Sequence, residues 1–200
     1  MTTADEMVDR VFRALLRGEL GTADLGARTL SMWLGQSTMG LYHHFGSLDG
    51  FLIRVDGEGW RYLLDRLDRA QREGAGLEQL GLSYVRFATA HPALYEIMAV
   101  RSFDRARFRA EGRLRAEKPL LEGFHQLLSR AGSVDPERDA VLVFAGLHGL
   151  ASLATSGRLD LGIGKSPRQR LREAVENVVR VVRQPRSARQ LSPQRRRKAP

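Results

Sequence analysis

Residues 30–45 read LSMWLGQSTMGLYHHF, and this stretch decides the fold. Apolar residues recur at helical spacing on both sides of Gly35, which ends a short helix predicted over residues 27–34. Ser37 is a good N-cap for a second short helix, because its hydroxyl can accept a hydrogen bond from an unpaired backbone N–H. Two helices of about two turns joined by a glycine turn are typical of a helix-turn-helix unit.

The second of these helices has side chains suited to a nucleic-acid surface, whereas Leu41 and Phe45 point inward. Its small residues let it approach base edges, and Tyr42 and His43 can donate hydrogen bonds to phosphate. The helix N-terminus itself favours a phosphate oxygen. We therefore expect DNA contacts from Arg28, Ser37, Thr38, Met39, Gly40, Tyr42 and His43.

The same stretch resembles the recognition-helix signature of the TetR (tetracycline-repressor) family of transcription regulators. The matching positions are Gly35, Ser37, Leu41, Tyr42, His44 and Phe45, with Leu30 in the preceding helix. In such a context His44 is expected to be a structural residue buried beside Tyr42. Adjacent histidines on a helix point about 100° apart, so His43 and His44 are not expected to hold a metal.

Three positions depart from that signature. Ser31 stands where the family usually has alanine, and Gln36 stands where it usually has a small apolar residue. Leu48 occupies a position where many members carry a lysine that contacts the phosphate backbone. These departures bear on the details of DNA contact more than on the fold.

The rest of the chain has helical periodicity, and no stretch has the alternating pattern of a strand. A first helix carries the stripe Val8, Val11, Phe12, Leu15 and Leu16. A long fourth helix begins after Ser47, and Gly57 and Gly59 are expected to weaken it locally. A seventh helical region covers about residues 106–130, where Pro119 must kink the helix or start a new one. We expect an all-α protein of about nine helices.

These patterns divide the chain into three parts. Residues 1–46 form a three-helix DNA-binding domain, residues 47–183 a helical domain for ligand binding and dimerisation, and residues 184–200 a basic disordered tail. The last two helices, about residues 137–155 and 167–183, are more apolar than one side of a small domain requires. We expect them to form a four-helix bundle with their twofold mates.

The second half resembles the WHG-type C-terminal domain of one TetR branch, so the two resemblances together span roughly residues 7–182. The segments that carry it are YVRFA at 84–88, HPALYEIM at 91–98 and LHGLASL at 147–153. The match is partial, because Phe144 stands at the aromatic position of the Trp-His-Gly cluster.

Two interpretations of the aromatic residues in this half stay open. His148 is either a satisfied core or interface residue or a ligand-binding one, and the aromatic residues either fill the core or line a cavity for a small effector. On the second interpretation, the pocket is expected to be lined by Tyr62, Tyr84, Phe87, Met98, Phe103, Phe124, Phe144 and His148.

The formal net charge of +9 indicates a polyanionic partner, either nucleic acid or an acidic membrane surface. Most of the excess lies from Arg180 onward, where there is no Asp or Glu, so a DNA-binding face must be a local patch. The sequence has no cysteine, no signal-peptide pattern and no apolar run near the ~20 residues of a membrane span. We expect a cytoplasmic protein that does not enter the membrane.

Three classes of function are possible for such a chain: an enzyme, a membrane-surface or adaptor protein, and a DNA-binding regulator. No Gly-rich phosphate loop, Ser/His/Asp set or metal-ligand spacing supports an enzyme, and no cofactor is expected. The recognition-helix signature argues against a membrane-surface or adaptor protein that does not bind DNA. We expect a homodimeric repressor that a small effector releases from a palindromic double-stranded DNA operator. An activator or a corepressor-dependent regulator of the same fold is the alternative.

Overall fold

The computed structural model describes residues 3–104, 106, 118–159 and 166–183. Within these residues there are nine α-helices, one 3₁₀ helix and one π-helix, and there is no strand. The prediction of an all-α fold is confirmed. The tail predicted over residues 184–200 and most of the region predicted to be helical at 106–117 lie outside the described residues.

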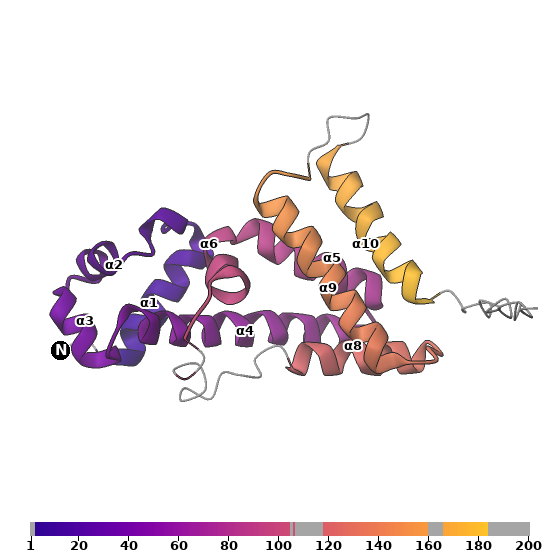
Figure 1. Ribbon diagram of the computed structural model, residues 1–200, viewed down its shortest axis with the longest axis horizontal. Coiled ribbons are helices and arrows are strands. Elements are labelled where there is room, and N and C mark those ends of the chain that lie inside the picture. Colours follow the sequence, from indigo (N-terminus) through magenta and orange to yellow (C-terminus); the bar gives the residue numbers. More distant parts are fainter. Residues whose placement is uncertain (1–2, 105, 107–117, 160–165, 184–200) are drawn as a thin grey trace, which may run out of the picture.

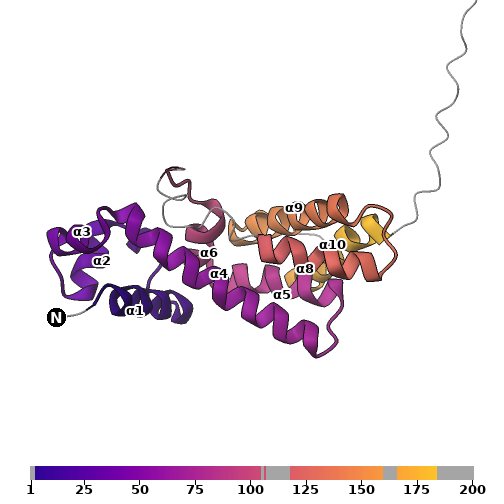
Figure 2. The ribbon, with the colours of Figure 1, turned by 90° about the horizontal axis from the view of Figure 1, so that it is seen from below.

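Three helices and a 3₁₀ turn gather at the N-terminal end of the molecule (Figures 1 and 2). They are α1 (Ala4–Arg17), η1 (Thr22–Asp24), α2 (Ala27–Leu34) and α3 (Thr38–Phe45). Helix α1 begins at a capping box, in which the Glu6 N–H donates to Thr3 Oγ1 at 3.2 Å and the Thr3 N–H donates to Glu6 Oε2 at 2.8 Å. Its apolar stripe, which includes Met7, Val11 and Leu15, is buried against the other helices.

Helix α4 (Leu48–Arg72) is 25 residues long and joins the two parts of the molecule (Figures 1 and 2). The helix starts beside α3 and runs the length of the body. Gly57 and Gly59 do not interrupt it, and both are buried. A Cβ at Gly59 would lie 2.5 Å from Met98 Sδ, so the missing side chain makes room for Met98. The glycine that costs helix propensity therefore permits a close helix contact.

The body is built from five further helices and a π-helix around the second half of α4 (Figure 1). They are α5 (Leu77–Ala90), α6 (Pro92–Tyr95), η2 (the π-helix Glu96–Val100), α8 (Lys118–Arg130), α9 (Pro136–Thr155) and α10 (Pro167–Arg183). Pro119 is the second residue of α8 as described, and because residues 107–117 lie outside the described part, the choice between a kink and a new helix stays a prediction.

Two glycines set how closely the body helices pack. A Cβ at Gly81 on α5 would lie 3.0 Å from Leu147 of α9 and 3.1 Å from Val175 of α10. A Cβ at Gly146 on α9 would lie 2.7 Å from Val178 of α10. Helices α5, α9 and α10 therefore form one tightly packed layer. Gly149, also on α9, does not share this role, because a Cβ there would meet nothing within 4 Å.

Candidate nucleic-acid interface and regulatory core

The turn between α2 and α3 has the geometry that a helix-turn-helix unit needs. Gly35 ends α2 with φ 69°, in the left-handed region that glycine occupies at little cost. The Gly35 N–H donates to the Met32 carbonyl at 3.0 Å, and the Gln36 N–H donates to the Ser31 carbonyl at 2.9 Å. These bonds pair the last carbonyls of α2 and turn the chain directly into α3.

The inner face of α3 is fixed to its neighbours. Ser37 caps the helix, since its Oγ accepts from the Gly40 N–H at 3.0 Å, as predicted. Leu41 is fully buried, and the ring of Phe45 lies 4.8 Å from that of Phe51 in an edge-to-face arrangement. The helix is therefore held on α2 and α4 and leaves its other side to solvent.

The outer face of α3 carries most of the predicted DNA-contacting residues. Met39 is 77% exposed and Tyr42 is 40% exposed, both large side chains with apolar surface in water. His43 is exposed one turn from Met39, while Thr38 and Gly40 are half-buried. The exposed Arg28 lies separately, in the first turn of α2, and the exposed Ser37 is occupied as the helix cap.

The expectation that His44 is buried is wrong. His44 is exposed, and its ring lies 5.6 Å from that of His43 and 6.1 Å from that of Phe45. The inner face of α3 is already taken by Leu41 and Phe45, which are four residues apart. His44 precedes Phe45 by one residue and so points about 100° away from that face.

Gly50 positions α3 relative to α4, and sequence analysis did not single it out. A Cβ at Gly50 would lie 2.1 Å from the carbonyl oxygen of Phe45, far inside any allowed contact. The Gly50 N–H also donates to Ser47 Oγ at 3.0 Å, which caps α4. The end of the exposed helix is thus in direct contact with the first turn of α4. The pair Asp49-Gly50 in a first helical turn is the only sequence signal for this approach.

Three of the eight residues predicted to line an effector pocket lie together, around a tyrosine that the prediction left out. Tyr95 O–H is 2.7 Å from His148 Nδ1 and 3.4 Å from the Tyr84 hydroxyl. The ring of Phe144 lies 6.2 Å from that of Tyr84 and 6.1 Å from that of His148. Burial raises the pKa of the Tyr95 phenol, against the opposing hydrogen bond from Tyr84, so Tyr95 keeps its proton.

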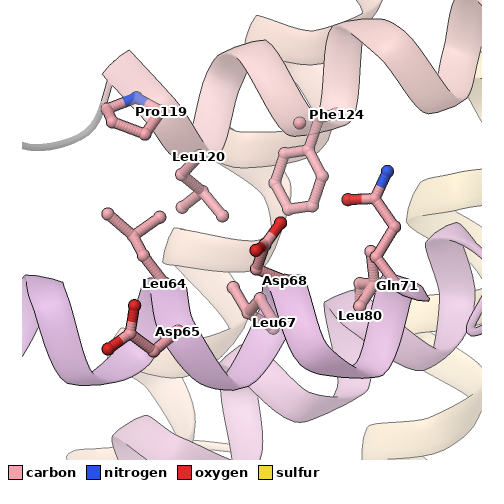
Figure 3. A pocket seen from close by; sticks show the side chains of 10 residues that line it. Leu64, Asp65, Leu67, Asp68, Gln71, Leu80, Pro119, Leu120 and Phe124 are labelled. Carbon is pink, nitrogen blue, oxygen red and sulfur yellow. The ribbon is translucent and has the colours of Figure 1, made fainter. Parts of the chain in front are cut away.

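The other five predicted pocket residues lie elsewhere in the body. Tyr62 and Phe87 lie together, with ring centroids 6.2 Å apart. Met98 packs on α4 at Gly59, and Phe103 lies under the guanidinium of Arg101, which is 5.8 Å from the ring centroid. Phe124 lines a cavity of about 210 Å³ with residues of α4, α5 and α8 (Figure 3). The structure therefore separates the predicted set into several places.

A second contact joins the N-terminal helices to the body, in addition to α4. Helix α6 packs on α1 and η1, and His91, between α5 and α6, lies near the backbone of Leu16 at the end of α1. The ring of His91 also lies 5.2 Å from that of Phe87. Burial lowers the pKa of His91, the Leu16 backbone opposes this effect, and Arg66 adds to it.

Two other kinds of site are absent from the described residues. No group of three or more His, Cys, Asp or Glu residues there could hold a metal ion. No helix in the described parts is long and apolar enough to cross a membrane.

Comparison with known families gives one match. Residues 77–182 match the family described as "Tetracyclin repressor-like, C-terminal domain". The matched stretch contains α5, α6, η2, α8, α9 and all but the last residue of α10. None of the curated proteins matches the chain.

Several solved structures share the fold. One is a protein of unknown function from Rhodococcus sp. RHA1, with a TM-score of 0.64 and 24% identity over 86% of this chain and 95% of that one. A second, provisionally described as the regulatory protein SCO4313, has a TM-score of 0.62 and 17% identity over 88% and 94% of the two chains. A third, superantigen PfiT, has a TM-score of 0.57 and 18% identity over 90% and 95%. At these identities the likeness shows the fold alone.

Proposed function

This chain belongs to the tetracycline-repressor-like family of regulators, and on that premise we propose that it is a homodimeric repressor that binds a palindromic DNA operator. A small effector releases it. Residues 1–46 bind DNA, and residues 47–183 bind the effector and dimerise. The protein acts in the cytoplasm and is not an enzyme.

The exposed face of α3 is the observation that carries the proposal. A helix whose inner residues are buried and whose outer face presents Met39, Tyr42 and His43 can enter a major groove without unfolding its neighbours. Tyr42 and His43 would bind phosphate, and Thr38 and Met39 would contact base edges. Arg28 would add a phosphate contact from α2.

The proposed dimer is supported by apolar surface on α9 and α10. Leu142 and Leu153 on α9 are each 43% exposed, and Val181 on α10 is 72% exposed. Gly149 has open space above it on the same helix. A second copy that packs α9 and α10 against their twofold mates would bury these side chains in a four-helix bundle.

The test is a selection of bound fragments from random duplexes by the purified full-length chain at physiological salt. We expect the recovered sites to share an inverted repeat whose half-sites lie about one helical turn apart (~34 Å) or slightly more. The repeat should bind roughly 1,000-fold more tightly than a scrambled duplex. Recovered fragments with no common sequence would overturn the proposal.

Transcription from a template with the selected site over the promoter then separates a repressor from the alternatives. A repressor lowers transcription when added alone. An activator raises it, and a regulator that needs a corepressor changes it only when a small molecule is added.

A further inference from the structure

The cavity between α4 and α8 has an apolar floor (Figure 3). Leu67 of α4, Leu80 of α5, and Leu120 and Phe124 of α8 all line it, and each is no more than 6% exposed. Its volume of about 210 Å³ exceeds the roughly 150 Å³ of an engineered apolar cavity that binds benzene, so a small organic molecule fits. An apolar chain placed here would leave water for a hydrocarbon surface, which is favourable at about 25 cal/mol per Å².

The polar lining of this cavity comes from α4 and is negatively charged. Asp68 and Gln71 point from α4 toward α8, with the Asp68 carboxylate beside the ring of Phe124, while Asp65 lies at the outer edge (Figure 3). No Lys or Arg is among the described residues that line the cavity. The net charge of the chain is +9, whereas the charged side chains that line this cavity are all negative.

Asp68 is available to a new partner. It forms an ion pair with Arg72, at an Asp68 Oδ2 to Arg72 Nη2 distance of 3.5 Å, and the two side chains are 67% and 72% exposed. An exposed pair at this distance contributes little free energy. A cation that also buries an apolar chain beside Asp68 would displace Arg72 at small cost.

We propose that this cavity binds an organic cation with an apolar chain, of the primary-amine class. The ammonium donates to the Asp68 carboxylate and to the Gln71 side-chain oxygen, and it faces the ring of Phe124. The chain lies along Leu67, Leu80 and Leu120. The inference rests on the proposed function, for which it names the effector class: the ligand fills the space between α8 and the helix whose first turn contacts α3.

The test compares three ligands with the same chain and different head charges: octylamine, octanol and octanoate. Calorimetric titration of the full-length protein at pH 7 should show octylamine binding roughly fivefold more tightly than octanol, and octanoate binding most weakly. Asp68→Asn should abolish the preference for the amine. Equal affinity for all three ligands, or an unchanged preference in Asp68→Asn, would overturn the proposal.

Two further variants act as controls. Asp9→Asn removes the same kind of exposed i,i+4 pair, with Arg13, on α1 far from the cavity, and should bind octylamine as the native chain does. Gly123→Leu adds a side chain at a lining position where a Cβ would meet nothing within 4 Å, so it should block the amine without lowering the melting temperature. If octylamine binds Gly123→Leu as tightly as it binds the native chain, the cavity is not the octylamine site.

The titrations contain no DNA, so their failure leaves the DNA-binding proposal intact. Conversely, a selection that recovers no common sequence would overturn the proposed function but would leave amine binding measurable. Once DNA binding and amine binding are both established, octylamine should weaken the protein's binding to the selected DNA site. The DNA site should weaken octylamine binding by the same factor. If operator affinity is unchanged at saturating amine, the ligand is bound without being the effector class.

Discussion

The N-terminal helices and the body differ in where their proposed function lies. In the N-terminal part, most of the side chains that would contact DNA lie on one exposed face of α3, and a stretch of 16 consecutive residues contains that face and the turn before it. In the body, the proposed ligand site is a space between helices, lined by residues from 64–71, from α5 and from 119–124. A surface motif can therefore be read from a short stretch, whereas a cavity depends on how distant stretches pack.

The contact between α3 and α4 is where a single substitution should have the largest effect on DNA binding. Gly50→Ala puts a methyl group 2.1 Å from the Phe45 carbonyl, so α3 must move. We expect a loss of about 1–3 kcal/mol in the free energy of unfolding and a fall of more than tenfold in operator affinity. Denaturant unfolding and gel shifts measure the two effects.

Gly123→Ala is the matched control, since a Cβ there meets nothing within 4 Å and alanine favours a helix. This variant should keep its operator affinity and gain about 1 kcal/mol at most. Native operator affinity in Gly50→Ala would show that the angle between α3 and α4 does not matter.

The body can be tested through its apolar outer face. Val181→Asp would place an unpaired charge in the proposed four-helix bundle and should raise the dissociation constant of the dimer roughly 100-fold, about 3 kcal/mol. Val181 is 72% exposed within one chain, so the fold of the subunit should survive. Sedimentation at micromolar concentration measures the effect.

Val134 provides the control for this variant. It is 96% exposed and lies in the loop between α8 and α9, outside the proposed bundle. Val134→Asp should sediment as the native protein does. A dimer that persists in Val181→Asp would place the subunit interface elsewhere.

Tyr42→Phe sharpens the assignment of the α3 face by removing a single hydroxyl. If that hydroxyl binds a phosphate, affinity should fall about tenfold for every sequence, while the salt slope should stay the same because the hydroxyl carries no charge. Tyr62→Phe removes a hydroxyl that accepts from Arg66 Nη1 at 3.2 Å in the body, and should leave DNA affinity unchanged. A loss confined to the best operator sequence would make Tyr42 a base contact instead.

The smallest expected effect concerns the joint between α1 and α6. The pKa of His91 is lowered mainly by burial, so the folded protein holds this side chain neutral at a pH where the unfolded chain binds a proton. Between the ordinary histidine pKa, about 6.5, and the lower folded value, the free energy of unfolding should therefore decrease as pH falls. His91→Gln, which keeps an N–H near the Leu16 backbone, should flatten this slope in urea titrations from pH 7 to 5.

The exposed His125 on α8 is the control for His91. His125→Gln should follow the native pH dependence. If the free energy of unfolding changes equally with pH in the native chain, His91→Gln and His125→Gln, His91 does not contribute to the pH dependence.

Local chemistry explains what the sequence predicted well. The boundaries of α2 and α3 follow from Gly35 and Ser37, each of which acts through bonds to residues at most four positions away. The start predicted near residue 137 is confirmed within one residue, since α9 begins at Pro136 and Asp135 Oδ1 accepts from the Arg138 N–H at 3.2 Å. Caps, turns and apolar stripes need no knowledge of tertiary contacts.

Two of the features that were missed in the body depend on residues far apart in the chain. The bond from Tyr95 to His148 spans 53 positions, so nothing in the local sequence distinguished Tyr95 from the other aromatic residues of the body. The need for glycine at Gly59 is visible only once Met98 lies against it. The error at His44 has the opposite cause, because the family resemblance was preferred to the helical geometry that places His44 off the inner face.

The most direct test of the account is whether α3 reads the DNA sequence. Selection from random duplexes should be repeated with Thr38→Ala and Met39→Ala, which change the outer face and leave the buried Leu41 and the cap at Ser37 intact. We expect the preferred bases to change at symmetric positions of both half-sites, while affinity for scrambled duplexes stays within about twofold because the phosphate contacts remain. Recovery of the native consensus by both variants would contradict the claim that this face reads the sequence.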